Sequence, residues 1–304
     1  MSESARRDQR LLLISVAVSA AFAVISSVWG ILSGSSMIVF DGLYSFASVG
    51  LSVLAVIGLR FARRGPDERF PWGREAVEPL VVVFKAATLA ALCLYAVVGG
   101  IGDLLSGGRD VELGSAVGYG VFATVAGVVT AIVLRTAARR RGTSDLVRAE
   151  AAEWLGDSLL SVGVLVGFLI AAWLTWAGRA DIARYIDPGM VVLVSAAFLW
   201  IPAKLIVGAL REIVGMSPSE QVLAQLQEAV QEVEREFGLA ESFVRASKVG
   251  GRMDVEVDYI VGEDSAVRTV ADCDTVRAGL HRRLAALGLE RSLLVSFTND
   301  RRWV

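Results

Sequence analysis

The stretch Ala151-Ala-Glu153-Trp-Leu-Gly-Asp157-Ser-Leu-Leu160 places two carboxylates one helical turn apart at the start of a long apolar segment. From Leu159 to Thr175 the chain carries no charged residue. A third carboxylate, Asp41, lies in the apolar stretch Met37-Ile-Val-Phe-Asp41-Gly-Leu-Tyr-Ser45-Phe46. An ionised side chain in hydrocarbon is energetically costly, so acidic residues there usually face a cavity or a bound partner. Three of them indicate that a cation passes between them.

Composition predicts an α-helical membrane protein. The 304 residues are 54% hydrophobic and 20% charged, and several apolar runs reach the length of about 20 residues that a bilayer demands. We expect six transmembrane helices, at roughly residues 11–33, 37–61, 79–104, 113–135, 149–177 and 188–209. The first run is longer than the apolar part of a signal peptide and has no clear cleavage site, so we expect it to remain as a span.

Arginine is concentrated in alternate connections between these spans. The amino terminus, the connections between spans two and three and between spans four and five, and the end of span six carry most of the arginines near the spans. These are Arg6, Arg7, Arg10, Arg60, Arg63, Arg64, Arg69, Arg74, Arg135, Arg139, Arg140, Arg141, Arg148 and Arg211. The opposite loops carry only Arg109, Arg179 and Arg184. The positive-inside rule therefore predicts a multi-pass protein of the cytoplasmic (inner) membrane with both termini in the cytoplasm. We interpret the arginine run at 139–141 as a topology anchor, so no nucleic-acid partner is expected.

From Gly215 onward the composition changes from that of a membrane segment to that of a soluble domain. We expect an N-terminal cytoplasmic arm at 1–10, a transport domain at 11–212 and a cytoplasmic domain at 213–304. Ser217-Pro-Ser-Glu220 predicts a capping box that starts a helix, and strands at 243–249 and 252–261 would join at Gly250-Gly251. A second helix and a strand at 293–297 follow. This αββαβ order indicates a small two-layer α+β domain that resembles a ferredoxin-like unit.

Apolar spacing of three and four residues predicts which side chains the two soluble helices bury. The first helix would bury Val222, Leu223, Leu226, Val230, Val233 and Phe237, and the second Val270, Val276, Leu280, Leu284 and Leu287. In the strands, Val255, Val257 and Tyr259 alternate with Asp254, Glu256 and Asp258, which predicts one buried and one polar face.

These pieces, in this order, resemble the cation diffusion facilitator family of divalent-metal transporters. The resemblance rests on the stretches 35–41 and 64–80, on Glu153-x-x-x-Asp157, and on Asp187-Pro188 at the start of the sixth span. It implies a homodimeric secondary transporter, not an enzyme, that exports a metal ion from the cytoplasm in exchange for protons. The cargo would be Mn²⁺, Fe²⁺, Zn²⁺, Co²⁺ or Cd²⁺, and no prosthetic group is expected.

The resemblance further implies a metal site between the second and fifth spans, built from Asp41, Ser45, Glu153 and Asp157. Residues four apart project from the same helix face, so two helices can direct four oxygens at one ion. Ser45 stands where a carboxylate is usual in the family, and it could instead bond a backbone carbonyl of its own helix. Glu153 stands where His or Asp is usual. An all-oxygen set favours harder ions such as Mn²⁺ or Fe²⁺ over Zn²⁺ or Cd²⁺.

The span boundaries alone predict different membrane depths for the proposed ligands, which conflicts with a shared metal site. They place Asp41 and Glu153 at depths that differ by roughly 10 Å, at about 1.5 Å per residue.

Whether the chain has two further metal sites known in the family is not decided by the sequence. The loop after the second span keeps Asp67 but has Arg74 where a histidine is common, and the soluble domain has one histidine, His281, with Asp272 and Asp274 near an expected ligand position.

The sequence allows more than one role for each of two charged residues near the spans. Lys85 could extend to the interface as an anchor or act as a charge partner in proton coupling. Glu150 could form a salt bridge to an arginine of the preceding loop or serve as a way-station for ions. The competing function is a non-transporting membrane metal sensor or scaffold, which would bind an ion once without flux. An intramembrane enzyme is disfavoured because the sequence has no nucleophile elbow or phosphate loop.

Overall fold

The computed structural model describes residues 3–62, 64–138, 145–263, 265–285 and 290–304. Its membrane part is α1 (Glu3–Ser33), α2 (Ser36–Ala62), α3 (Val77–Leu105), α4 (Leu113–Ala138) and α5 (Asp145–Trp176), followed by the short α6 (Ala180–Ala183), α7 (Ile186–Phe198) and α8 (Trp200–Ile213). Among the described residues, six helical segments are long and apolar enough to cross a membrane, the sixth running from Ala180 to Ile213. This confirms the six expected spans.

The sixth span is not one continuous helix. The α7 helix ends at Phe198 and α8 begins at Trp200. Pro202 explains the break, because its nitrogen has no hydrogen to donate and its ring clashes with the carbonyl four residues earlier, which is that of Phe198. Hydropathy alone does not register such an interruption.

The chain divides into two compact units, one of Met1–Val53 with Lys85–Ala203 and the other of Leu54–Phe84 with Lys204–Val304. The second unit therefore contains the C-terminal end of α2, the N-terminal end of α3 and most of α8, together with the C-terminal domain. The division that the sequence predicts at 212/213 stays a prediction.

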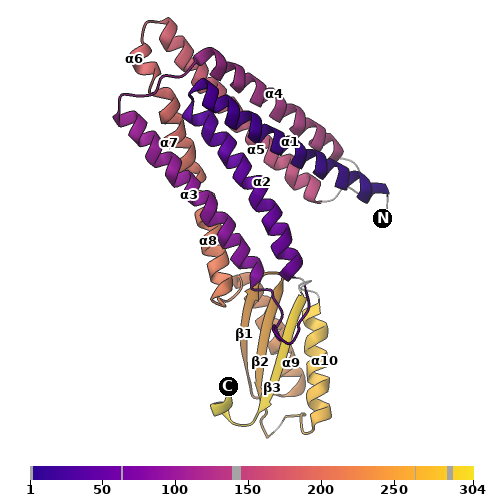
Figure 1. Ribbon diagram of the computed structural model, residues 1–304. Helices are drawn as coiled ribbons and strands as arrows, with labels where there is room; N and C mark the ends of the chain where they lie inside the picture. The colour runs from indigo at the N-terminus through magenta and orange to yellow at the C-terminus, as the bar shows by residue number, and fades with distance from the viewer. Residues whose placement is uncertain (1–2, 63, 139–144, 264, 286–289) are drawn as a thin grey trace. The chain divides into compact units, whose positions relative to one another are not determined.

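In the first unit, α1 and α2 approach each other closely. A Cβ on Gly42 would lie 2.5 Å from the backbone nitrogen of Ser27, and one on Gly30 would lie 2.5 Å from that of Val39, so side chains at these positions would force the helices apart. The α4 and α5 helices run side by side, with α1 against them (Figure 1). Gly167 of α5 meets the Met190 side chain of α7, which fits the packing role that small residues play in membrane helices.

In the second unit, α9 (Glu220–Phe237), β1 (Glu241–Val249), β2 (Arg252–Ile260), α10 (Val270–Leu284), β3 (Glu290–Thr298) and the short η2 (Arg301–Trp303) form a layered domain. The sheet has the order β1-β2-β3, with β1 and β2 antiparallel and β2 and β3 parallel. Gly250 turns the β1–β2 hairpin with φ of +58°. The expected αββαβ order is confirmed, and the ferredoxin-like identity of the domain stays a prediction.

The domain core lies between the sheet and the two helices. Its buried members include Leu226, Val230 and Val233 of α9, Met253, Val255, Val257 and Tyr259 of β2, and Val276, Leu280 and Leu284 of α10. The predicted alternation along β2 is therefore confirmed. Asp258 is the exception on the polar side, because it is buried and its carboxylate accepts a hydrogen bond from the Arg245 guanidinium at 2.6 Å.

Three details of this domain correct the sequence reading. The capping box is not at Ser217, because α9 begins at Glu220 with Ser219 as N-cap and no side-chain cap bond. The capping box belongs to α10 instead, where Thr269 and Asp272 bond each other's backbone. Val270 is 76% exposed because it occupies the first turn after this cap. Leu287 lies outside the described residues.

Candidate metal site

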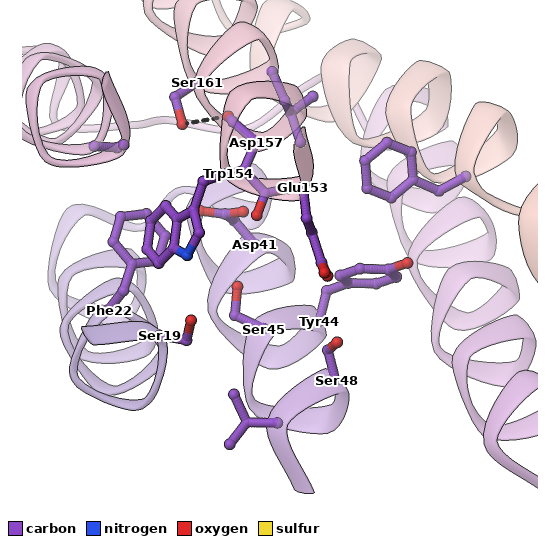
Figure 2. A pocket seen from close by; sticks show the side chains of 15 residues that line it. Ser19, Phe22, Asp41, Tyr44, Ser45, Ser48, Glu153, Trp154, Asp157 and Ser161 are labelled. Carbon is purple, nitrogen blue, oxygen red and sulfur yellow. Dashed lines mark hydrogen bonds between the residues drawn. The ribbon is translucent and has the colours of Figure 1, made fainter. Parts of the chain in front are cut away.

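A cavity of about 100 Å³ lies between α1, α2, α4, α5 and α7. Asp41 and Ser45 line it from α2, and Glu153 and Asp157 line it from α5. The four residues that the family resemblance implies as ligands thus border one space. In Figure 2 the carboxylates of Asp41 and Asp157 point toward each other, Ser45 projects into the same space, and the Glu153 side chain runs toward Tyr44.

The cavity also resolves the depth difference. It extends from Asp41 to Val49 on α2 and from Glu153 to Ser161 on α5. Eight residues of helix span about 12 Å. All four residues border the cavity, so the offset expected from span boundaries does not prevent them from lining one space.

Contacts of Trp154 set the rotation of α5. Its indole nitrogen donates to the Ser15 hydroxyl of α1 at 2.7 Å, and its ring is buried. The Ser158 hydroxyl donates to the Trp154 carbonyl at 2.6 Å. The contact of Trp154 with α1 fixes which face of α5 is turned toward the cavity. Glu153, one residue earlier, and Asp157, three residues later, both line the cavity.

Asp187 of α7 fixes the start of α2. Its carboxylate accepts hydrogen bonds from the Ser35 hydroxyl at 2.5 Å, the Ser36 amide at 2.8 Å and the Met37 amide at 3.2 Å. The two amides are among the backbone donors that a helix N-terminus leaves without intrahelical partners. Asp187 is 3% exposed, so it acts as a buried cap from another helix, one turn before Asp41. The sequence reading used Asp187 only as a family marker.

Tyr119 of α4 contacts the candidate ligand Asp41, which the sequence alone does not predict. Its hydroxyl donates a hydrogen bond to Oδ2 of Asp41 and lies 2.7 Å from the Ser26 hydroxyl of α1. The available signal was a tyrosine inside an apolar span, because a buried phenol usually has a hydrogen-bond partner. The identity of that partner depends on the fold.

The acidic residues border the cavity without forming a closed cage. Among the described residues, no group of three or more His, Cys, Asp or Glu side chains is placed to hold a metal ion. The described lining residues also include no Lys, Arg or His. Asp41 is partly buried while Glu153 and Asp157 are more exposed. The arrangement described is therefore an open acidic lining and not a formed coordination shell.

The alternative for Ser45 was a hydrogen bond to its own helix. In the described part of the chain, Ser52 does this, donating to the Ser48 carbonyl at 2.8 Å, and no such bond is found for Ser45. Lys85 donates to the Ser52 hydroxyl at 3.2 Å and does not line the cavity. The Glu150 side chain lies outside the described residues.

The loop between α2 and α3 uses Asp67 for an internal ion pair. Asp67 pairs with Arg74, whose guanidinium is buried, stacks 4.4 Å from the centre of the Phe70 ring and donates to the Gly65 carbonyl at 2.9 Å. The Phe70 amide, followed by the Arg74 side chain, lowers the pKa of Asp67 below its ordinary value. A cationic side chain thus neutralises the carboxylate that the resemblance associated with a loop metal.

The aspartates considered for a metal site in the soluble domain are also engaged. Asp272 closes the α10 capping box, where the amides of Arg268 and Thr269 lower its pKa. Asp274 pairs with Arg277 at 2.7 Å. His281 is exposed on α10.

The fold and the cavity together define a multi-pass integral membrane protein with an acidic site between its helices. A family model for the cation efflux transmembrane domain matches residues 12–214. The chain belongs to the cation efflux family, which confirms the family expected from the sequence.

Similarity to individual proteins extends over much of the chain. The zinc transporter ZitB of Escherichia coli is 27% identical over 219 residues, covering 72% of this chain and 67% of that protein. An uncharacterised transporter of Methanocaldococcus jannaschii is 25% identical over 288 residues, covering 93% and 95%. The manganese efflux system protein MneS of Bacillus subtilis is 30% identical over 173 residues, covering 54% and 57%.

Proposed function

We propose that this protein exports a divalent transition-metal ion from the cytoplasm across the inner membrane in exchange for protons. The ion would bind between Asp41 and Ser45 of α2 and Glu153 and Asp157 of α5. The observation that carries the proposal is that all four side chains border one cavity. Membership in the cation efflux family and the names of the relatives, which handle zinc and manganese, support the cargo class.

The exchange follows from the charge of the site. Three carboxylates around a small space repel one another, and either protons or a divalent ion relieve that repulsion. Binding of one therefore displaces the other. If the cavity is exposed alternately to the two sides of the membrane, each cycle carries metal one way and protons the other. The arginine distribution favours cytoplasmic termini, so net export follows from an inward proton gradient.

The ion preference follows from the donor atoms. With no histidine among the four proposed ligands, the donors are all oxygen, which favours Mn²⁺ or Fe²⁺ over Zn²⁺ or Cd²⁺. Zinc also accepts carboxylates, so this is a preference and not an exclusion. We further propose that the protein works as a homodimer whose C-terminal domains hold the protomers together.

Proteoliposomes containing a pH-sensitive dye test this function. The purified full chain is reconstituted, and Mn²⁺, Fe²⁺, Co²⁺, Zn²⁺ and Cd²⁺ are added in turn. We expect metal-driven proton flux that is strongest for Mn²⁺ or Fe²⁺ and is abolished in Asp157→Ala, with Asp181→Ala as an acidic control outside the cavity. Metal uptake without proton movement would contradict antiport. Metal binding without uptake would favour the sensor or scaffold function instead.

A further inference from the structure

Tyr119 connects a helix that supplies no proposed ligand to the proposed metal site. It lies on α4, is 1% exposed, and its ring packs between Phe22 and Trp29 of α1, with ring centroids 6.3 Å and 5.8 Å away. Trp29 is itself fixed, because its indole nitrogen donates to the Ser115 hydroxyl at 2.8 Å. The phenol is therefore held in one place by rigid neighbours.

The direction of the hydrogen bonds follows from the available protons. Tyr119 has a single hydroxyl hydrogen, and it donates this hydrogen to Oδ2 of Asp41. The 2.7 Å contact with Ser26 must then be a bond in which Ser26 donates to the Tyr119 oxygen. Ser26 is fully buried. The chain Ser26→Tyr119→Asp41 thus runs from α1 through α4 to α2.

This arrangement leaves the two oxygens of Asp41 unequal. Oδ2 is engaged by a fixed donor, while Oδ1 has no such restraint from Tyr119. A carboxylate can bind an ion through one oxygen or both, and binding through both favours ions that take six or more ligands. Four-coordinate tetrahedral binding, which zinc prefers, needs only one oxygen from each ligand.

We propose that Tyr119 is a positioning residue that holds Oδ2 of Asp41, makes binding of an ion through both oxygens less favourable, and thereby limits the preference for larger, higher-coordinate ions. The inference rests on the proposed function of Asp41 as a ligand. The all-oxygen composition favours Mn²⁺, and Tyr119 opposes this preference by disfavouring binding through both oxygens of Asp41. The balance between Mn²⁺ and Zn²⁺ therefore depends on a hydroxyl that does not itself touch the ion.

Equilibrium binding in the full chain tests this without requiring transport. Mn²⁺ binding is measured by electron paramagnetic resonance in lipid nanodiscs, and Zn²⁺ by competition. Tyr119→Phe keeps the ring and removes the hydroxyl, and we expect the Mn²⁺/Zn²⁺ affinity ratio to rise about tenfold, the lower end of what outer hydrogen-bond partners of metal ligands contribute. Ser26→Ala, which removes only the outer bond, should raise the ratio less. Tyr95→Phe is the matched control, because Tyr95 is 74% exposed on α3, and it should leave the ratio unchanged.

The outcomes separate the two proposals. An unchanged Mn²⁺/Zn²⁺ affinity ratio in Tyr119→Phe, including the case in which both affinities fall by the same factor, would overturn the role of Tyr119. The ratio should no longer respond to Tyr119→Phe when Asp41→Asn is also present, and a response that persists would overturn it too. Wild-type protein that binds Mn²⁺ but moves none into liposomes would contradict the transport function while leaving the binding ratio as a valid test of Tyr119.

Discussion

Arg74 and Asp67 form an ion pair that closes the loop between α2 and α3. Asp67 also accepts hydrogen bonds from the amides of Arg69 at 3.0 Å and Phe70 at 2.9 Å. The loop is further held within its own unit, since Arg252 of β2 donates to the Trp72 carbonyl at 2.6 Å and lies 3.4 Å from the Glu75 carboxylate. A fixed side-chain cation thus organises a segment that connects two membrane helices and contacts the soluble domain.

The loop should open in acid. Hydrogen bonds, first from the Phe70 amide, lower the folded-state pKa of Asp67, so its contribution to stability is present above the ordinary aspartate pKa and is lost as the pH falls through the lowered value. We expect exchange protection of the Arg69 and Phe70 amides, corrected for intrinsic rates, to be constant from about pH 7 to 5 and to fall below about pH 4. Asp67→Asn should remove this pH dependence. Protection that falls equally in Asp67→Asn would assign the transition to another group.

Arg74 should not tolerate replacement by lysine. Its planar guanidinium stacks on the Phe70 and Phe61 rings while donating to Asp67 and Gly65, and an ammonium cannot reproduce this geometry. We expect Arg74→Lys to destabilise the loop by about 1–3 kcal/mol, nearly as much as Arg74→Ala. Limited proteolysis within residues 64–76 measures this. Arg69→Lys is the control, and cleavage of Arg74→Lys at the wild-type rate would contradict the prediction.

Asp187→Ala should weaken the start of α2. It leaves the Ser35 hydroxyl and the amides of Ser36 and Met37 without their acceptor, and an unsatisfied buried donor costs about 1–3 kcal/mol. We expect a clear fall in the thermal unfolding midpoint in detergent, with a smaller fall for Asp187→Asn, which keeps one acceptor oxygen. Asp181→Ala, whose side chain is 69% exposed, should change little. Equal midpoints for Asp187→Ala and Asp181→Ala would refute the cap.

The soluble domain should depend on Leu280 and not on Val270. Leu280 is fully buried whereas Val270 is 76% exposed, so Leu280→Ala should cost about 2–5 kcal/mol and Val270→Ala less than about 0.5 kcal/mol. Cys273 of α10 packs partly buried against the core and reports local opening in the full chain. Thiol labelling at Cys273, read by peptide mass, should accelerate strongly in Leu280→Ala only. Similar rates in both variants would show that the burial pattern is not what stabilises α10.

Glu153→His should shift ion preference toward zinc. It adds one imidazole nitrogen to an otherwise all-oxygen set, and imidazole suits Zn²⁺ better than Mn²⁺. The measurement is the ratio of initial Mn²⁺ and Zn²⁺ uptake rates in proteoliposomes, with Glu153→Gln as a control that keeps an oxygen. An unchanged ratio in Glu153→His would mean that selectivity is determined elsewhere.

The six spans were predictable because their length and apolarity are local properties of the sequence. The break between α7 and α8 was also encoded locally, in Pro202, but a hydropathy average does not detect a missing hydrogen-bond donor. The capping box was misplaced because Ser217 and Ser219 both precede the same helix, and only backbone geometry decides which one caps it. The sequence carries the same capping chemistry at α10, in Thr269 and Asp272.

The contacts of the site were less predictable than its residues. The spacing of Glu153 and Asp157 follows directly from the helix period, and the family resemblance selected Asp41 and Ser45. The bond from Tyr119 to Asp41 joins residues 78 positions apart, and it depends on how closely α1, α2 and α4 pack. The Arg74–Asp67 pair could not be predicted for a related reason. The resemblance identifies Arg74 as a replacement for a common histidine, but it does not indicate which group the guanidinium would bind.

A double-mutant cycle on Asp41 and Asp157 tests most directly whether one ion is held between α2 and α5. Mn²⁺ affinity is measured for wild type, Asp41→Asn, Asp157→Asn and the double variant in nanodiscs. If both carboxylates bind the same ion, the double variant should lose less affinity than the sum of the two single losses, because the first substitution already weakens the coordination that the two carboxylates share. Affinity losses that simply add would mean that the two carboxylates act independently, which would contradict a shared site.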